Sequence, residues 1–181
     1  DVVVLEEGAD PTTATYRDIM VQKLSGDLSE ADFSGANLLD IDFSSANLRG
    51  ATFSGATIAS SEQDIGVERI DSVFTGANLI ETDFSGIGTT IDADFQYIQS
   101  TNSTFEDANL VGSIFFMSRM DAIRFDRANL EGVSFGGVDS LGLNFTAANV
   151  RNGGFFHGNL RGARFIDADV AGANYFGANL T

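Results

Sequence analysis

The residues best suited to chemistry in this chain are a single histidine and three pairs of carboxylates. His157 could act as the base beside a nucleophile and an orienting group, but no serine motif accompanies it and the chain contains no cysteine. Alternate carboxylates could hold a hard cation through their oxygens, yet no pair continues into the spacing of a calcium-binding loop. We therefore predict solvated carboxylates and a protein without a catalytic centre, a metal site or a cofactor. The pairs are Asp40/Asp42, Asp92/Asp94 and Asp167/Asp169.

The charge of the chain excludes several classes of partner. Lys plus Arg number 10 against 26 Asp plus Glu, and the formal net charge is −16, of which residues 1–100 carry −14. Such acidity repels bare nucleic acid and anionic membrane surfaces. A basic protein surface or a protein site built to hold DNA remains compatible with it. No apolar run approaches the ~20 residues of a membrane span, so the sequence predicts no transmembrane segment. The start at Asp1 rather than Met predicts a processed, exported chain or a trimmed one.

A large apolar residue recurs at every fifth position, a period that fits neither a helix nor a long strand. Within 95–180 the eighteen such positions hold only two polar residues, Ser100 and Ser140, and the same period runs in other frames over 28–58 and 74–84. The position two before each large residue is usually small, most often Ala. Residues two apart in extended chain point to the same side. Each repeat is therefore predicted to be a very short strand with one large and one small inward residue, followed by a turn.

Repeated turning in one sense winds the chain into a coil, and stacked coils pair their backbones at about 4.8 Å. Phe and Leu alternate from one repeat to the next, so each type recurs every ten residues. A three-sided coil would mix the two types in every column, whereas a four-sided coil keeps the columns uniform. The alternation therefore favours four sides. The predicted aromatic columns are Phe95, Phe115, Phe135, Phe155, Tyr175 and Phe105, Phe125, Phe145, Phe165.

The repeat resembles that of the pentapeptide repeat family, in which Ala is followed by Asp or Asn, then by Leu or Phe, then by two variable residues. The resemblance covers about residues 26–181. It implies an all-β fold, a right-handed quadrilateral parallel β-helix of about seven coils. The matching triplets include Ala36-Asn37-Leu38, Ala46-Asn47-Leu48, Ala77-Asn78-Leu79, Ala108-Asn109-Leu110, Ala128-Asn129-Leu130 and Ala178-Asn179-Leu180.

Two interruptions and one flanking segment divide the chain. The period breaks at 59–71, which is either three repeats with one extra residue or an eleven-residue loop, and again at a one-residue bulge near 86–90. Insertions in repeat proteins lie on a binding face or are tolerated surface loops. Before the repeats, Asp10-Pro11 is typical of a helix start. We therefore predict an N-terminal segment with a capping α-helix in 1–25 and the β-helix in 26–181. The apolar residues at helical spacing are Tyr16, Ile19, Met20 and Leu24.

One outward side of the predicted coil differs from the other three. On the side whose inward column begins at Phe95, the outward positions carry no Asp, Glu, Lys or Arg after Asp94. A contiguous apolar patch on an acidic rod usually marks a contact surface. The alternative is that its rings lie flat against the corners or are covered by a terminal segment. We predict a partner-binding site on this side, formed by Tyr97, Ile114, Phe116, Met117, Phe156 and Phe176.

The function that these features favour first is a non-catalytic protein-interaction or scaffold module. The repeat continues to Thr181, and the open edge of a last coil invites association, so a homodimer through the C-terminal coil is a second kind of partnership. The family resemblance implies cyanobacterial and chloroplast relatives, including exported and thylakoid-lumen proteins. It therefore suggests a lumenal or periplasmic location, with a cytoplasmic one as the alternative. One version of this function is a subunit of a larger, membrane-associated photosynthetic assembly.

A second function belongs to a different class, the DNA mimics. The resemblance implies it because some pentapeptide repeat proteins are acidic rods that bind DNA gyrase. The −14 of residues 1–100 and the interruption at 59–71 fit this interpretation. Six arginines between 119 and 164 interrupt the negative surface, however, and the sequence lacks the C-terminal helix through which those proteins dimerise.

Overall fold

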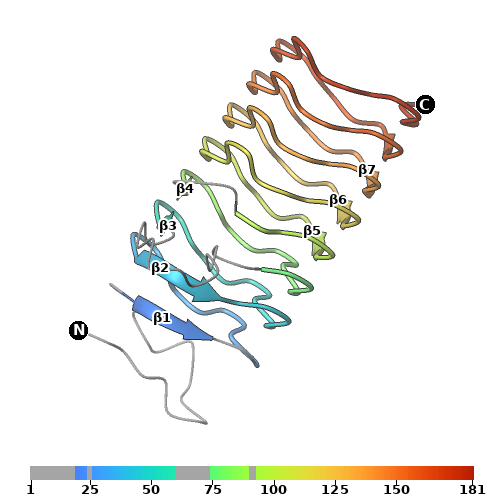
Figure 1. Ribbon diagram of the computed structural model, residues 1–181. Helices are drawn as coiled ribbons and strands as arrows, with labels where there is room; N and C mark the ends of the chain where they lie inside the picture. The colour runs from blue at the N-terminus through green and yellow to red at the C-terminus, as the bar shows by residue number, and fades with distance from the viewer. Residues whose placement is uncertain (1–18, 24–25, 60–73, 90–92) are drawn as a thin grey trace, which may run out of the picture.

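The repeats form a rod of stacked coils. The computed structural model describes residues 19–23, 26–59, 74–89 and 93–181, and its coils follow one another along the rod from the blue end of the chain to the red end (Figure 1). The described residues form short strands and turns without a helix, and every pair of named strands is parallel. The fold is the right-handed quadrilateral parallel β-helix that the family resemblance implies.

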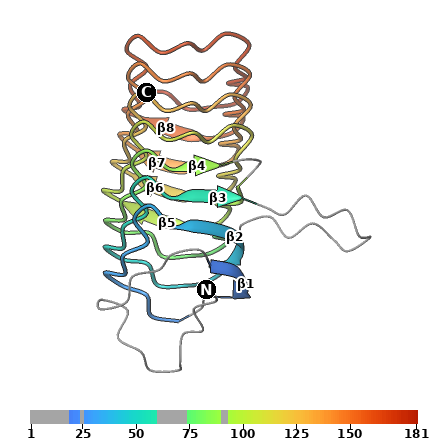
Figure 2. The same cartoon turned by 90° about the vertical axis from the view of Figure 1, so that its left-hand side faces the viewer.

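Short strands on two sides of the coil form two parallel sheets. The first sheet has the order β1-β2-β3-β4 and the second the order β5-β6-β7-β8, so each strand lies beside the strand of the next coil. Figure 2 shows these coils stacked along one axis. The strands are β1 (Ile19–Lys23), β2 (Asn37–Asp42), β3 (Thr57–Ala59), β4 (Gly88–Thr89), β5 (Gln99–Thr101), β6 (Arg119–Asp121), β7 (Asp139–Leu141) and β8 (Asn159–Arg161).

The register of the strands gives the length of each coil. Gln99 pairs with Arg119, Arg119 with Asp139 and Asp139 with Asn159, so one coil of the second half takes 20 residues. Single bridges on the other sides keep the same step. Since the inward period is five residues, the coil has the four sides that the alternation of Phe and Leu predicts.

One coil of the first half is eleven residues longer. Asn47 pairs with Asn78, a step of 31. The ring of Phe74 stacks on that of Phe43 at a centroid distance of 5.0 Å, which places both on the same side. Three further repeats with one extra residue would have put Phe74 on a different side, so the interruption is an eleven-residue insertion within one coil. Most of the segment 59–71 lies outside the described residues.

The second interruption adds a single residue. Gly88 pairs with Asn109, a step of 21, whereas Asp94 pairs with Ile114, a step of 20. The extra residue therefore lies between Gly88 and Asp94, at or just beyond the segment 86–90. Residues 90–92 lie outside the described part of the chain.

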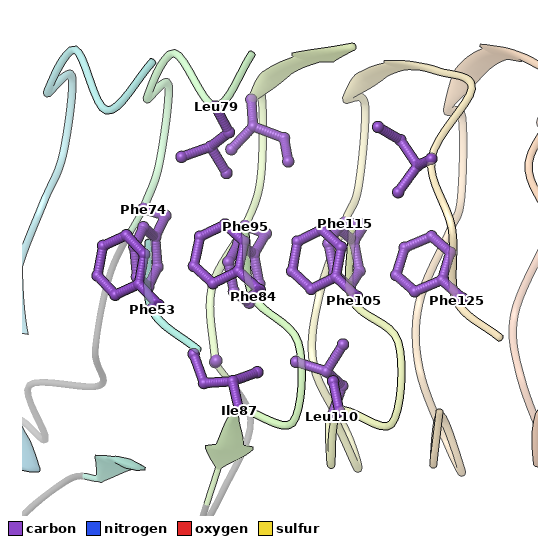
Figure 3. Packing of buried hydrophobic residues seen from close by; sticks show 14 of the residues in the cluster. Phe53, Phe74, Leu79, Phe84, Ile87, Phe95, Phe105, Leu110, Phe115 and Phe125 are labelled. Carbon is purple, nitrogen blue, oxygen red and sulfur yellow. The ribbon is translucent and has the colours of Figure 1, made fainter. Parts of the chain in front are cut away.

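Two columns of aromatic rings fill the interior of the rod (Figure 3). Within a column each ring stacks on the ring of the next coil, as Phe95 does on Phe115 at 4.8 Å between centroids. Between the columns the rings meet edge to face, as Phe95 and Phe105 do at 5.6 Å. Both are favoured geometries of aromatic pairs, worth about 0.5–1.5 kcal/mol each beyond burial. The rings that are almost completely buried are Phe33, Phe43, Phe53, Phe74, Phe84, Phe95, Phe105, Phe115, Phe125, Phe135, Phe145 and Phe155.

The two serines that occupy positions of the large inward residues, Ser100 and Ser140, are accommodated by hydrogen bonds. The Ser100 hydroxyl donates to the carbonyl of Leu79 at 3.2 Å, and the Ser140 hydroxyl donates to the carbonyl of Asn159 at 2.9 Å. A buried hydroxyl without a partner would cost free energy. These bonds let small polar residues replace Leu in the column while the 20-residue step of the coils stays unchanged.

The helix predicted before the repeats is wrong for the residues described there. Residues 19–23 form strand β1, which pairs in parallel with β2 from Ile19–Leu38 onward. Without β1, this edge of β2 would present unpaired backbone groups. The β-branched Ile19 and Val21 favour extended chain, so pairing with this edge outweighs the helical spacing of a few apolar residues. Residues 1–18 and 24–25 lie outside the described part of the chain.

Candidate protein-binding face

The candidate site is the outer surface of the side whose inward column includes Phe95 and Phe155. Parallel bridges hold the coils of this side in register from Asp94 to Asn174. Each side presents three outward residues, one before the inward aromatic residue and two after it. The structure brings the predicted residues together here, with Ile114 taking part in a bridge. We call the large residues that follow the inward aromatic residues the aromatic strip, which consists of Tyr97, Phe116, Met117, Phe156, His157 and Phe176.

The members of the aromatic strip differ in exposure. The exposed fractions are 54% for Tyr97, 53% for Met117 and 72% for Phe176, whereas Phe116 and Phe156 are half-buried. Tyr97 and Met117 stand at corners of the coil with φ of 57° and 55°, a left-handed conformation that is uncommon for large side chains. The alternative of rings lying flat therefore holds for two members, and the other four, His157 included, are exposed to solvent.

Side chains of the strip contact one another along the axis of the rod. Tyr97 and Phe116 meet edge to face with centroids 6.4 Å apart, and His157 meets Phe176 edge to face at 5.5 Å. The rings of Phe116 and Phe156 lie 6.5 Å apart, although two coil steps of about 4.8 Å separate their backbones. Both rings must therefore lean over the coil between them.

Two glycines make this leaning possible. A Cβ atom built on Gly136 would lie 2.3 Å from Cζ of Phe156, and one built on Gly137 would lie 2.7 Å from Sδ of Met117. Carbon atoms in contact are about 3.5–4.0 Å apart, so any side chain at these positions would displace the strip. We call Gly136 and Gly137 the glycine floor. Sequence reasoning missed the floor, although stepping by 20 places both glycines between the coils of Phe116 and Phe156.

The surface around the strip carries little charge. Asp94, at the Tyr97 end, is the last charged residue before a run of outward positions without Asp, Glu, Lys or Arg that extends to Gly177. The Asp94 carboxylate accepts hydrogen bonds from the backbone N–H of Gln96 at 2.8 Å and from Thr75 Oγ1 at 3.2 Å. Negative charge thus lies at one end of the side and aromatic surface at the other.

Charged side chains of the other three sides pair along the axis. The Arg127 guanidinium bonds Asp107 through Nε and Oδ1 at 2.7 Å and lies 3.5 Å from Glu106. Its hydrogen bond to Asp107 holds the pKa of that carboxyl below its usual range, and the pKa of Arg127 rises in turn. Exposed pairs of this kind contribute little to stability, but they remove isolated charge from the second half of the rod. Further pairs are Arg49–Glu81, Arg124–Glu106 and Arg151–Asp169.

The residues considered first for chemistry do not converge on one site. Within the described part of the chain, no three metal-ligating side chains gather in one group. Asp169 accepts hydrogen bonds from the backbone N–H of Ala171 and from Arg151, which together lower its pKa. The side chains of Asp40 and Asp92 lie outside the described residues. His157 packs against Phe156 and Phe176, and therefore belongs to the aromatic strip.

The C-terminal coil exposes apolar residues as well. The exposed fractions are 49% for Ile166, 38% for Val170 and 51% for Leu180. The inward rings of Phe165 and Tyr175 are half-buried, because each stacks on a described ring on one side only. Burial raises the pKa of the Tyr175 hydroxyl.

Similarity to known proteins agrees with this architecture. The family model of pentapeptide repeats matches the sequence in eight copies, at residues 27–59. The chain thus carries pentapeptide repeats. No curated protein matches this chain in sequence. The described part of the chain has no helix of the length and hydropathy needed to cross a membrane.

Several solved pentapeptide repeat structures are similar to it. HetL, which is involved in heterocyst differentiation regulation in the cyanobacterium Nostoc sp. strain PCC 7120, is 19% identical over 90% of this chain and 85% of its own, with a TM-score of 0.55. QnrB1, a plasmid-mediated fluoroquinolone resistance protein, is 14% identical over 92% of each chain, with a TM-score of 0.43. A protein of the Arabidopsis thaliana thylakoid lumen is 31% identical over 63% of this chain and 64% of its own, with a TM-score of 0.32. The likeness to HetL shows the fold.

Proposed function

We propose that this pentapeptide repeat protein is a non-catalytic binding module whose partner protein docks on the aromatic strip. The observation that supports this proposal is the exposure of Tyr97, Met117 and Phe176 on a side that carries no Asp, Glu, Lys or Arg beyond Asp94. The chain as a whole carries −16, so such a side differs sharply from the rest of its surface. Contiguous exposed apolar surface on a soluble protein usually marks an interaction site.

Covering the strip would release enough free energy for binding. Full burial of a Phe or Met side chain is worth about 1.5–3 kcal/mol, and Phe176 is 72% exposed. Aromatic residues dominate the energetics of protein interfaces. Phe116 and Phe156 already lean against the glycine floor, so their rings lose little side-chain freedom when a partner covers them.

The experiment is capture of partners from an extract of the source organism by the full chain. The strip variant Phe116→Ser/Phe156→Ser/Phe176→Ser is expected to lose the partner that the unchanged protein captures. A matched control removes three exposed apolar residues from other sides. Capture of the same partner by the strip variant would refute the proposal, provided that circular dichroism shows both variants folded. The control variant is Val111→Ser/Leu141→Ser/Ile166→Ser.

DNA mimicry is a second candidate function, supported by the −14 of residues 1–100. The ion pairs of Arg124 and Arg127 with Glu106 and Asp107 reduce the free negative charge of the second half. Salt separates the two functions, because charged contacts are screened within about 3 Å at 1 M salt while apolar contacts are not weakened. Loss of the captured partner when the salt concentration is raised from about 0.1 M to about 1 M would favour the mimic. Retention would favour the aromatic strip.

Two further parts of the proposal concern assembly and location. Exposed Val170 and Leu180 support a homodimer through the C-terminal coil, which analytical ultracentrifugation of the full chain and of Leu180→Asp would test. The family resemblance supports a lumenal or periplasmic location and membership of a photosynthetic assembly. Fractionation of the source cells tests both, and recovery in the cytoplasm would contradict them.

A further inference from the structure

We infer that the partner segment which docks on the aromatic strip is a short amphipathic α-helix that carries basic residues at the end lying near Asp94. This inference rests on the proposed function and specifies the partner. It follows from the dimensions of the strip, from the hydrogen bonding of the side beneath it, and from the distribution of charge along that side.

The size of the strip favours a short segment over a second copy of the rod. From Tyr97 to Phe176 the strip spans four coil steps, or about 19 Å at about 4.8 Å per step. Three outward residues per side give a width of about 10 Å at about 3.3 Å per residue. The projected area is therefore on the order of 200 Å², against about 800 Å² per partner in a stable protein–protein interface. A docked rod would also have to cover the ion-paired sides that adjoin the strip.

The backbone of this side excludes an added strand. An extended peptide gains affinity by pairing with the free edge of a sheet. Here the strip lies on the face of the stacked coils, and the coils beneath it are bonded to one another: Phe95 N donates to the carbonyl of Ile114, Phe115 N to that of Ser134, and Phe135 N to that of Gly154. An extended peptide on this face would leave its own backbone groups without partners. A helix satisfies its backbone internally.

The spacing of the coils also matches a helix. Successive turns of an α-helix are about 5.4 Å apart, close to the coil spacing of about 4.8 Å, whereas side chains on one face of a strand are about 6.6–6.8 Å apart. Over four steps the helix drifts by about 2.4 Å from the coils and the strand by about 7 Å. About 13 helical residues cover the 19 Å of the strip at about 1.5 Å per residue. One apolar residue per turn can therefore meet Tyr97, Met117, the Phe156 ring that covers the glycine floor, and Phe176 along the strip.

The charge of the side sets the orientation of the helix. Asp94 stands at the Tyr97 end, Asp42 lies on the same side farther toward the N-terminus, and this side has no basic residue between Asp42 and Gly177 among those the structure describes. Basic residues at one end of the helix would therefore meet carboxylates, while the same residues at the Phe176 end would meet none. Charge complementarity of this kind fixes register and suppresses reversed binding.

The test is selection from a phage-displayed library of random 16-residue peptides on the immobilised full chain. We expect the enriched peptides to carry apolar residues at helical spacing and Lys or Arg clustered at one end. Synthetic copies should bind the strip variant at least tenfold more weakly, and the control variant Val111→Ser/Leu141→Ser/Ile166→Ser as tightly as the unchanged protein. Asp94→Asn should weaken the basic-ended peptides by about two- to fivefold and leave neutral-ended analogues unchanged.

The outcomes separate this inference from the proposed function. Enriched peptides that need the strip but have apolar residues at alternate positions, or lack the basic end, would overturn the helix and leave the strip as a docking site. Peptides that bind the strip variant as tightly as the unchanged protein, or the absence of any enrichment, would overturn both.

Discussion

Adding one methyl group at Gly136 should rearrange the aromatic strip while leaving the rod folded. The new Cβ would lie 2.3 Å from Cζ, 2.5 Å from Cε2 and 2.9 Å from Cε1 of Phe156. Since the optimal separation of carbon atoms is about 3.5–4.0 Å, the ring must retreat by about 1.2 Å to reach an ordinary contact. The ring is the far end of a flexible side chain, so it can swing away from the floor and leave its contact with Phe116.

The expected change in the free energy of unfolding is small because two effects oppose each other. Phe156 is half-buried, and exposing it would cost about 1 kcal/mol, roughly half of the value for a fully buried Phe. Gly136 does not have a left-handed backbone, so Gly136→Ala would gain about 0.4–1 kcal/mol by restricting the unfolded chain. The net change should stay within about 1 kcal/mol. Binding should weaken by about tenfold, the equivalent of about 1.4 kcal/mol, because the docking surface loses one aromatic member.

Two measurements check this prediction. Aromatic NMR resonances of Phe156 and Phe116 should shift in Gly136→Ala, since their rings no longer lie side by side, and affinity for the captured partner should fall. Gly154→Ala is the matched control, because its Cβ would lie 3.4 Å from Phe156 Cε1, an ordinary contact. Unchanged Phe156 resonances and unchanged affinity in Gly136→Ala would refute the reasoning. A loss of more than about 3 kcal/mol of stability would show that the floor supports the fold itself.

Three further predictions concern the rod that carries the strip. Phe115→Ala should cost about 3–5 kcal/mol of unfolding free energy, because this ring is fully buried among four others. Phe165→Ala removes a half-buried ring and should cost about half as much. Equal losses of the two variants in urea unfolding would contradict the stacked core. Because Arg127 lowers the pKa of Asp107, the carboxylate stabilises the fold above its unfolded pKa of about 3.9 and loses that effect as the pH falls through the folded value. Asp107→Asn should therefore flatten the acid limb of the urea midpoint between about pH 2 and 5, and an unaltered limb would rule this out. Asn129→Ala breaks a ladder of side-chain amides, in which Asn129 donates at 3.2 Å to the coil below and accepts at 2.9 Å from the coil above; we expect a loss of about 1 kcal/mol, and an unchanged melting temperature would show that the ladder contributes nothing.

The interior could be predicted from the sequence because a single geometric rule governs it. Alternation of Phe and Leu at five-residue spacing fits only a coil with an even number of sides if columns are to be uniform. The predicted column of Phe95, Phe115, Phe135, Phe155 and Tyr175 is the one whose rings stack in the structure. Burial of rings in register leaves few alternatives, so sequence alone was sufficient.

The parts that sequence reasoning missed depend on neighbours in the next coil. Ile19 and Met20 have helical spacing, but the edge of β2 decides their conformation, and that edge exists only once the coil has closed. Gly136 likewise has no local signal, because its importance comes from Phe156, which lies one coil away. The lack of charge singles out in the sequence the side on which the strip lies, and the partner site there stays a prediction. The flat packing of two of its rings could be seen only with that glycine and that ring together.

The unequal coil steps of 20, 21 and 31 residues have a consequence for how such a rod can change in length. Each coil pairs with its two neighbours, and after an insertion the pairing returns to the same register within one turn. An added segment therefore shifts the numbering of all later residues but moves no side chain to another side. The length of the rod therefore changes in steps of about 4.8 Å, the height of one coil. Duplicating twenty consecutive residues would lengthen one face by the height of one coil. The distance between Asp94 and Phe176 could be changed in such steps without redesigning either end.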